Sequence, residues 1–246
     1  MISYAILVHN EHKELTDLLT VLYRHIDKDD ELVIVADNPT VEISKILNQN
    51  AFIKYYERDL NKDFAAQKNY LTSKCTKEYI FNIDADEIPN EYLLSNLKVI
   101  LKNNPNIDVY QVPRINTVQG ITDEHIKKWH WSVRKFKFDI LKRTKVFDIN
   151  SKEYQFLNKK AIIINRMNID KINIELEYYD VVINFADYQN RIYKNNNIIR
   201  WIKPVHEHLD GYKFISKLPN EEEYCIYHFK EIKKQEEQNM FYSQIN

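Results

Sequence analysis

Residues 78–89 read EYIFNIDADEIP, and this stretch decides how the 246-residue chain folds. It opens with β-branched and aromatic residues and contains no glycine, which predicts a buried strand. Three acids then follow within four positions, and extended geometry through Ala85 would direct the Asp84 and Asp86 carboxylates to one side. Pro89 suits the first turn of a helix, and Asn90 to Lys102 carries apolar residues at helical spacing.

These acids form a candidate cation site. Acids at the carboxyl end of a parallel strand lie where open α/β sheets bind their ligands. Hard oxygen ligands there suit Mg²⁺ or Mn²⁺, which usually bridges protein carboxylates to phosphates, whereas a solvated turn with a helix N-cap is the ordinary alternative. The chain has only two glycines, Gly120 and Gly211, which excludes a P-loop and a Gly-x-Gly-x-x-Gly turn. A bound phosphate would therefore be held by a metal and by side chains.

Composition excludes several classes of protein. The hydrophobic fraction of 44% supports a sizeable core, and the net charge of −1 gives no strong signal for nucleic-acid binding. Cys75 and Cys225 have neither metal-ligand nor disulfide-framework spacing, which favours a reducing compartment. We find no signal-peptide pattern and no transmembrane segment. These observations predict a cytoplasmic protein, and they leave peripheral contact with the inner membrane surface open.

Strands and helices alternate four times in the first hundred residues. Strands are expected at 2–8, 31–36, 52–56 and from 78, with helices at 15–23, 41–48 and 64–73. This alternation predicts an α/β fold with a mostly parallel, Rossmann-like sheet flanked by helices. Polar groups recur at the strand ends, and in such a sheet these ends gather along one edge and form a crevice; they are Asn10, Glu11, Asp37, Asp84 and Asp86.

The alternation stops near residue 104. Strands are expected at 109–113, 181–185, 198–202 and 224–229, followed by a polar helix at 230–245. Residues 120–180 suggest a less regular insertion or hairpin layer, in which 161–164 could be a strand. We find no repeat and no low-complexity linker, so residues 1–246 are expected to form a single domain with an irregular C-terminal half.

Several ordered motifs resemble a known family. The chain resembles glycosyltransferase family two, and most closely the branch of lipopolysaccharide-core sugar transferases with its phage and bacterial relatives. The likeness covers most of the chain and is weakest between residues 120 and 180. The motifs that carry it are DFAAQKN at 63–69, IDADE at 83–87, DYQNRIYKN at 187–195, IRW at 199–201 and PVHE at 204–207.

The resemblance implies a GT-A fold, a nucleotide-sugar donor and a divalent cation, Mn²⁺ or Mg²⁺, on the Asp-x-Asp motif. It implies a nucleotide-sugar-binding half at 1–104, an acceptor half at 105–229 with an insertion at about 120–180, and a C-terminal helix at 230–246. Residues 38–40 depart from the usual small turn, which leaves nucleotide identity open, with a UDP-sugar favoured. The implied nucleotide and donor contacts are His9, Asn10, Glu11, Asp37 (with the base), Lys68, Asn69 and Asp84.

The remaining site residues follow from the same motifs. Glu207 matches the position of the general base of inverting enzymes, and Asp187 is the rival base because it also follows a predicted strand. Asp84 and Asp86 are the expected metal ligands. His228 matches the position of an added histidine ligand, with His206 and His208 as second candidates. Arg191 could hold phosphate or acceptor, and a structural ion pair is the equal alternative.

The function that these residues predict is a metal-dependent, inverting glycosyltransferase. It would move a sugar from a nucleotide-diphosphate sugar to a hydroxyl of a glycan, lipid-linked or other acceptor. Acceptor contacts are expected between residues 120 and 194. Trp129, Trp131 and Tyr110 could stack on a sugar ring, although buried aromatics are commoner. The sequence leaves the oligomeric state open.

Two other functions remain open. A nucleotidyltransferase can use a similar sheet and acidic pair, but it usually carries a glycine-rich, basic loop near the N-terminus, which residues 8–12 do not provide. A non-catalytic protein that binds a sugar nucleotide or a glycan would bind without turnover.

Overall fold

A computed structural model describes residues 1–135 and 181–243. The first part of the chain alternates strands and helices in the order β1 (Ile2–Val8), α1 (His12–Leu22), β2 (Glu31–Ala36), α2 (Val41–Asn48), β3 (Ile53–Glu57), α3 (Phe64–Lys74) and β4 (Tyr79–Asp84). The remaining described elements are β5 (Glu87–Pro89), α4 (Glu91–Asn103), β6 (Val109–Gln119), α5 (Asp123–Lys128), β7 (Val133–Lys135), β8 (Val181–Lys194), β9 (Arg200–Ile202), β10 (His208–Asp210), β11 (Ile215–Lys217), the 3-10 turn η5 (Glu222–Tyr224), β12 (Ile226–Glu231) and α7 (Ile232–Ser243).

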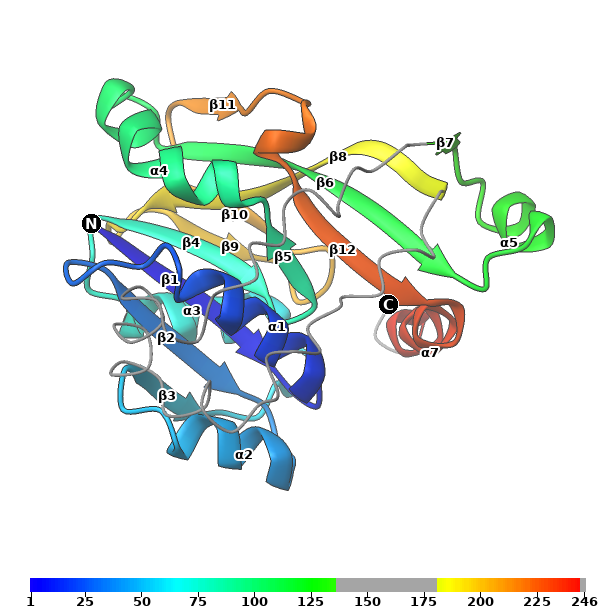
Figure 1. Cartoon of the computed structure of the whole chain (residues 1–246), viewed down its shortest axis with the longest axis horizontal. Coiled ribbons are helices and arrows are strands. Elements are labelled where there is room, and N and C mark those ends of the chain that lie inside the picture. Colours follow the sequence, from blue (N-terminus) through cyan, green and yellow to red (C-terminus); the bar gives the residue numbers. More distant parts are fainter. Residues whose placement is uncertain (136–180, 244–246) are drawn as a thin grey trace, which may run out of the picture.

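One sheet runs through most of these strands in the order β3-β2-β1-β4-β8-β6-β12-β5 (Figure 1). The four N-terminal strands pair in parallel, which confirms the expectation drawn from their alternation with helices. The direction changes at β8, which is antiparallel to both β4 and β6. Strand β12 then runs parallel to β6 and antiparallel to β5. The short strand β5, which follows the acidic turn, is therefore the last strand of the sheet and pairs with β12.

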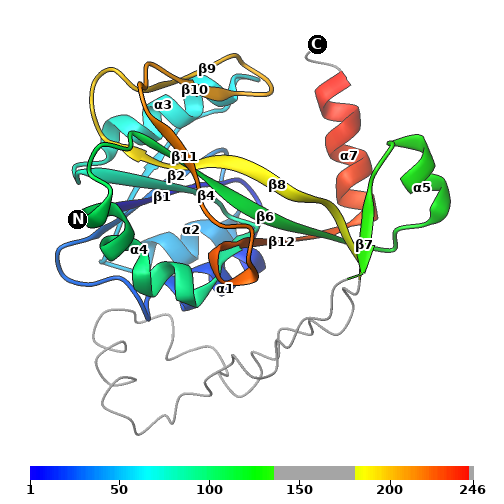
Figure 2. The ribbon, with the colours of Figure 1, turned by 90° about the horizontal axis from the view of Figure 1, so that it is seen from above.

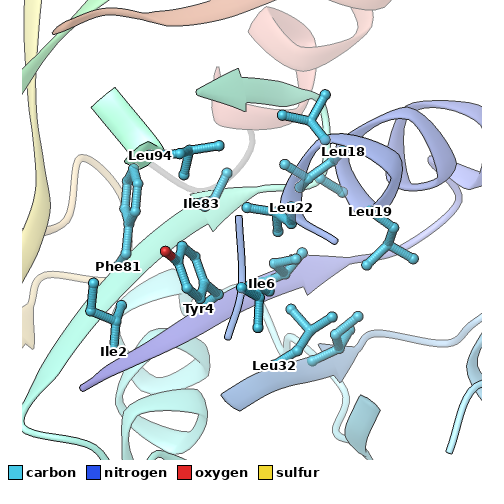
Figure 3. Packing of buried hydrophobic residues seen from close by; sticks show 14 of the residues in the cluster. Ile2, Tyr4, Ile6, Leu18, Leu19, Leu22, Leu32, Phe81, Ile83 and Leu94 are labelled. Carbon is cyan, nitrogen blue, oxygen red and sulfur yellow. The ribbon is translucent and has the colours of Figure 1, made fainter. Parts of the chain in front are cut away.

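Helices cover both faces of the parallel strands (Figure 2). Alternate residues of β1 face opposite sides, so Tyr4 and Ile6 pack with α1, α2 and α4, whereas Ala5 packs with α3. Tyr4, Phe81 and Leu18 lie in the larger of these two layers (Figure 3). A strand buried on both faces is apolar along most of its length, which is why 4–8 and 32–36 read as continuous apolar runs.

The antiparallel hairpin of β9 and β10 lies on the α3 face of the sheet (Figure 2). Asn69 on α3 fastens it, because its amide accepts from the backbone N–H of Trp201 at 2.9 Å and donates to the carbonyl at 2.8 Å. At the far end of the sheet, α7 lies beside α5, with His125 Nε2 3.6 Å from Glu236 (Figures 1 and 2).

Several predicted boundaries were wrong. Pro89 ends strand β5 instead of opening a helix, because Asn90 is the N-cap and its side chain accepts from the N–H of Tyr92. Helix α1 begins three residues earlier than predicted, at His12. Strand β8 continues from 181 to 194 rather than stopping at 185, because it pairs with β6 and with β4 in turn.

The predicted strand at 161–164 and most of the predicted insertion lie outside the described residues. Within residues 1–135 and 181–243, no helix combines the length and the apolar character that crossing a bilayer requires.

Glu31 ties β2 to its neighbours through a buried carboxylate. It accepts hydrogen bonds from the Ser3 hydroxyl at 2.6 Å, the Thr76 hydroxyl at 2.9 Å and the Lys54 ammonium at 2.8 Å. Burial acts to raise the pKa of Glu31, but these donors outweigh it and lower the pKa to about 2. The native state therefore stabilises the ionised form.

We expect Glu31→Gln to lower the free energy of unfolding by about 2 kcal/mol at pH 7, because the charged hydrogen bonds are lost. A depressed carboxyl pKa contributes stability above the unfolded value of about 4.3, and this contribution disappears as the pH falls toward the folded value of about 2. Urea unfolding between pH 7 and pH 2.5 measures the difference from wild type, which should shrink over that window. The exposed Glu57→Gln on β3 is the matched control, and equal losses in both variants would contradict the assignment.

Candidate functional site

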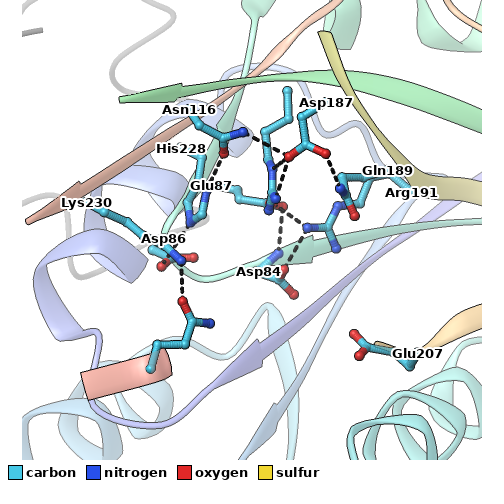
Figure 4. Close-up of polar contacts among 12 residues, drawn as sticks. Asp84, Asp86, Glu87, Asn116, Asp187, Gln189, Arg191, Glu207, His228 and Lys230 are labelled. Atoms are coloured by element: carbon cyan, nitrogen blue, oxygen red, sulfur yellow. Dashed lines mark hydrogen bonds and ion pairs between the residues drawn. The ribbon is translucent and has the colours of Figure 1, made fainter. Parts of the chain in front are cut away.

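The acidic turn lies between β4 and β5, at the carboxyl edge of the parallel strands. Asp84 is the last residue of β4, and Ala85 and Asp86 form a turn before β5 begins at Glu87. Extended geometry does not persist through Ala85, so the expectation that both carboxylates project to one side was wrong. Asp84 instead contacts Arg191, whereas Asp86 contacts His228 (Figure 4).

Glu87 is the buried centre of the turn, with no exposed surface. Its Oε1 accepts from Arg114 Nη1 at 3.0 Å and from Arg191 Nη2, and its Oε2 accepts from the N–H of Asp84 at 3.2 Å. Arg191 is 3% exposed and also donates to Asp84 Oδ2 at 2.6 Å. The structural ion pair expected as the alternative for Arg191 is present, and contact of Arg191 with phosphate or acceptor stays a prediction.

Asp84 remains one-third exposed although it pairs with Arg191. Burial of its carboxyl acts to raise the pKa of Asp84, but the charges of Arg191, Lys68 and Arg114 outweigh that effect and hold the pKa below its ordinary value. The carboxylate is therefore ionised at neutral pH, with one side held by Arg191.

Asp86 faces a different set of cations. His228 Nε2 lies 3.4 Å from its Oδ2, and Lys234 Nζ lies 3.9 Å from the same oxygen. Burial acts to raise the pKa of Asp86, but His228 and then Lys230 outweigh it, so the pKa lies below its ordinary value. Burial lowers the pKa of His228, because the charged imidazolium would be desolvated.

A hydrogen-bonded chain fixes which nitrogen of His228 faces Asp86. Asn116 Nδ2 donates to Asp187 Oδ2 at 2.9 Å, and since a carboxylate only accepts, the amide carbonyl must face the other way. That carbonyl lies 2.8 Å from His228 Nδ1, which therefore carries the proton and donates. A neutral imidazole with its proton on Nδ1 has its lone pair on Nε2, the ring nitrogen nearest Asp86, and this is the form that a cation at that place would bind.

Asp187 lies in the middle of β8, so the prediction that it follows a strand was wrong. Its Oδ2 accepts from Arg114 Nε at 2.9 Å and Nη2 at 2.7 Å as well as from Asn116, and its Oδ1 accepts from Gln189 at 2.6 Å. Burial acts to raise the pKa of Asp187, but Arg114 and Asn116 outweigh it and lower the pKa. Both oxygens are therefore engaged in hydrogen bonds to neighbouring side chains.

Glu207 precedes β10 on the hairpin that packs against α3. Lys68 Nζ lies 2.6 Å from its Oε1 and 4.4 Å from the centroid of the Trp201 ring. Lys68 is 5% exposed, whereas the Glu207 side chain is 19% exposed. In Figure 4 the Glu207 carboxylate points toward Asp84, and Lys68 acts electrostatically on that acid as well. Lys68 therefore links the hairpin acid to the acidic turn.

The predicted nucleotide contacts are partly brought together. His9 Nδ1 donates to the Asp37 carbonyl at 2.6 Å, so the ends of β1 and β2 meet. Glu11 Oε2 accepts from the N–H groups of His9 at 2.9 Å and Asn10 at 3.1 Å, and Asp37 Oδ1 accepts from the N–H of Leu60 at 3.0 Å. These contacts shape the loops, and binding of a nucleotide by His9, Asn10, Glu11 and Asp37 stays a prediction.

The side chains around Asp86 determine whether a metal ion fits beside the acidic turn. Among the residues that the structure describes, no group of three or more His, Cys, Asp or Glu is placed to hold a metal ion. Asp86 Oδ2 and His228 Nε2, 3.4 Å apart, nevertheless suit two neighbouring ligands of one cation with bonds of about 2.1 Å. Mg²⁺ and Mn²⁺ commonly take one or two protein ligands and complete their shell with phosphate and water, so this pair fits such an ion.

The other histidine candidates lie elsewhere. His206 is an exposed residue of the loop before Glu207, with a φ of 56°, and His208 begins β10. His228 is the candidate that the structure places against Asp86. Ligation by His206 stays a prediction.

Sequence reasoning did not select several residues of this network. Glu87 belongs to the acidic run, but its burial depends on Arg114 and Arg191, which lie 27 and 104 positions away in sequence. The other residues have no signature before the fold is known, because their partners are far away in sequence; they are Arg114, Asn116, Lys230 and Lys234.

We expect Arg191→Met to lower the free energy of unfolding by about 3 kcal/mol, because it leaves the buried Glu87 carboxylate short of a partner. Chemical denaturation measures this loss, and the exposed Arg200→Met on β9 is the matched control. The double variant with Glu87→Gln should lose less than the sum of the two single variants. Equal stability of Arg191→Met and Arg200→Met would contradict the role assigned to this ion pair.

Comparison with solved structures gives distant similarity. TarS of S. aureus, residues 1–349 in complex with UDP-GlcNAc, has a TM-score of 0.49 and 15% identity over 93% of this chain and 58% of that chain. Mannosyltransferase PcManGT from Pyrobaculum calidifontis, in complex with GDP-Man and Mn²⁺, has a TM-score of 0.38 and 17% identity over 46% of this chain and 35% of that chain. The chain thus spans less than two thirds of the length of each. A comparison with curated proteins found no match.

A family model gives the assignment. The model described as glycosyl transferase family 2 matches residues 3–163, which is more than half of the chain. The mostly parallel sheet between two layers of helices agrees with the GT-A fold that the sequence resemblance implied. The chain therefore belongs to glycosyl transferase family 2.

Proposed function

We propose that the chain is a metal-dependent, inverting glycosyltransferase that moves a sugar from a nucleotide-diphosphate sugar to a hydroxyl acceptor. One observation carries the proposal, beside the family assignment. Asp86 and His228 offer an oxygen and a nitrogen lone pair 3.4 Å apart at the carboxyl edge of the parallel strands. Ligands of α/β sheets bind at this edge.

Asp86 and His228 would hold Mn²⁺ or Mg²⁺, with Asp84 beside them. The cation, when bound, supplies positive charge that neutralises the β-phosphate of the leaving nucleoside diphosphate. Asn116 keeps His228 in the tautomer that can ligate, and Asp187 holds Asn116 in place. Arg191 keeps Asp84 ionised and oriented at the same edge.

Glu207 is the proposed general base, and its surroundings favour it over Asp187. The carboxylate of Asp187 accepts hydrogen bonds on both oxygens, which lowers its basicity and blocks the approach of an acceptor. Glu207 has Oε2 available beside the single described bond between Oε1 and Lys68, and it is partly exposed. Glu207 would take the proton of the acceptor hydroxyl as that oxygen attacks the anomeric carbon opposite the leaving diphosphate, which inverts the configuration.

The donor would lie along the ends of β1, β2 and β4. His9, Asn10, Glu11 and Asp37 would contact the nucleoside, and Lys68 would contact the diphosphate or the sugar. Asn69 would act through the Trp201 backbone that it fastens. A UDP-sugar is the favoured donor, and a glycan, a lipid-linked sugar or another hydroxyl compound is the proposed acceptor.

The Trp129 and Trp131 rings would contribute to acceptor binding. They lie 4.7 Å apart between centroids on the segment after α5, and the His125 ring stacks on Trp129 at 5.2 Å. Both indoles are partly exposed, so an aromatic surface is available to a sugar ring.

We expect Asp86→Asn and Glu207→Gln each to lower the rate of sugar transfer at least about 100-fold, because they remove the cation ligand and the base. A panel of UDP- and GDP-sugars with Mn²⁺ first identifies the donor by thermal shift, and release of nucleoside diphosphate then measures turnover. Asp210→Asn, an exposed acid on the same hairpin as Glu207, is the matched control. Unchanged rates in both variants would reject the assignments, and release of pyrophosphate would indicate nucleotidyl transfer.

We expect His228→Asn to weaken Mn²⁺ binding about tenfold in the absence of donor. Asn116→Ala should weaken it to a smaller extent, because His228 Nδ1 then loses the hydrogen-bond acceptor that keeps the proton on that nitrogen. Titration followed by the electron paramagnetic resonance signal of free Mn²⁺ measures both constants. The matched control is His130→Asn, because His130 is exposed and its φ of 53° is a conformation that Asn tolerates. Equal affinity in all three variants would remove His228 from the proposed site.

A further inference from the structure

Two lysines at the C-terminal end of the sheet lie beside the acidic turn and have no part in the function proposed so far. Lys230 belongs to β12, two residues after His228, and Lys234 lies in the first turns of α7. Both act electrostatically on Asp86 or contact it. Strand β12 thus carries Lys230 to the turn (Figure 4), and helix α7, which follows directly, carries Lys234.

Lys230 is a mostly buried cation whose described hydrogen bond goes to a neutral group. Its Nζ donates to Gln238 Oε1 at 2.6 Å. Within residues 1–135 and 181–243, no carboxylate lies within 4.0 Å of this nitrogen. A desolvated ammonium that has only an amide for a partner gains strongly from a nearby anion.

Lys234 is shared between two groups of acids. Its Nζ lies 3.3 Å from Glu14 Oε1 and 4.0 Å from Glu11 Oε1 on one side, and 3.9 Å from Asp86 Oδ2 on the other. The side chain is 37% exposed, so these ion pairs are weak and can be rearranged. The ammonium group can therefore turn toward a new anion at Asp86 without breaking a buried contact.

The arginines of the turn already pair with carboxylates. Arg191 and Arg114 lie behind the turn and are engaged with Glu87, Asp84 and Asp187. Figure 4 shows Lys230 and Arg191 on opposite sides of the turn. The lysines are thus the cations next to Asp86 that an incoming anion can engage.

We propose that Lys230 and Lys234 form a cationic arm that binds the diphosphate of the donor beside Asp86 and stabilises it as it leaves. The inference rests on the proposed function. The bond between the anomeric carbon and the β-phosphate oxygen breaks, its electron pair stays on that oxygen, and the two ammonium groups oppose the added negative charge without giving up a proton. Hydrogen bonds of this charged kind are about twice as strong as neutral ones.

Pyrophosphate tests the arm without knowledge of the sugar or the nucleotide. It is titrated calorimetrically into the full chain at saturating Mn²⁺, with Lys230→Gln, Lys234→Gln and Lys233→Gln compared with wild type. We expect Lys230→Gln to bind at least about tenfold more weakly and Lys234→Gln about threefold more weakly, while the exposed Lys233→Gln on the same helix stays within about twofold. Lys230→Arg, which keeps the charge, should recover most of the affinity.

Titration with Mn²⁺ alone separates this role from a structural one. Removing the positive charge 3.9 Å from Asp86 should leave Mn²⁺ binding to Lys234→Gln unchanged or tighter, whereas damage to the fold would weaken both Mn²⁺ and pyrophosphate. Since Lys234 is partly exposed, this variant keeps the test decisive even if Lys230→Gln does not fold.

The outcomes distinguish the two proposals. Weaker binding of pyrophosphate by Lys234→Gln, together with unchanged or tighter binding of Mn²⁺, supports the arm. Wild-type affinity for pyrophosphate in both Gln variants overturns the arm and leaves the proposed function standing. Failure of the wild-type chain to bind pyrophosphate with Mn²⁺ overturns the proposed function, and the arm with it.

Discussion

The buried carboxylate of Glu87 is the constraint on which the acidic turn depends. Burying a carboxylate is costly unless cations accompany it, and here Arg114 from β6 and Arg191 from β8 both do so. The contact joins three strands that are distant in sequence and fixes β5 at the edge of β12. The turn between Asp84 and Glu87 is thereby held at both ends, with the side chain of Asp86 directed to the opposite side from that of Asp84.

From this centre the polar contacts run in two directions. Toward β8, Asp187 accepts from Arg114 and from Asn116, and Asn116 in turn sets the proton of His228. The Asp187 carboxylate can only accept, which fixes the orientation of the Asn116 amide, and that amide in turn fixes the proton of His228 on Nδ1. Nε2 is then the ring nitrogen that faces Asp86. A side chain several contacts away from the turn thus decides whether an imidazole lone pair is available there.

The other direction leads to the hairpin that carries Glu207. Asn69 and Lys68 are neighbours on α3, yet one holds the backbone of Trp201 and the other pairs with Glu207. Because α3 also packs on β1 and β2, the hairpin acid is positioned by the same layer that covers the parallel strands. The proposed base and the proposed cation site therefore share a rigid support, although Glu207 lies 121 positions after Asp86 in the sequence.

The sequence by itself determined the parallel N-terminal sheet, because runs such as 4–8 and 32–36 are apolar on both faces and alternate with amphipathic segments. It also indicated Asp84, Asp86, Glu207 and His228 through local motifs. Tertiary structure alone decided the course of β8, the divergence of Asp84 from Asp86, and the partners of Glu87. Those features depend on contacts between residues about 30 to more than 100 positions apart, such as Arg191 with Glu87, and local spacing carries no record of such contacts.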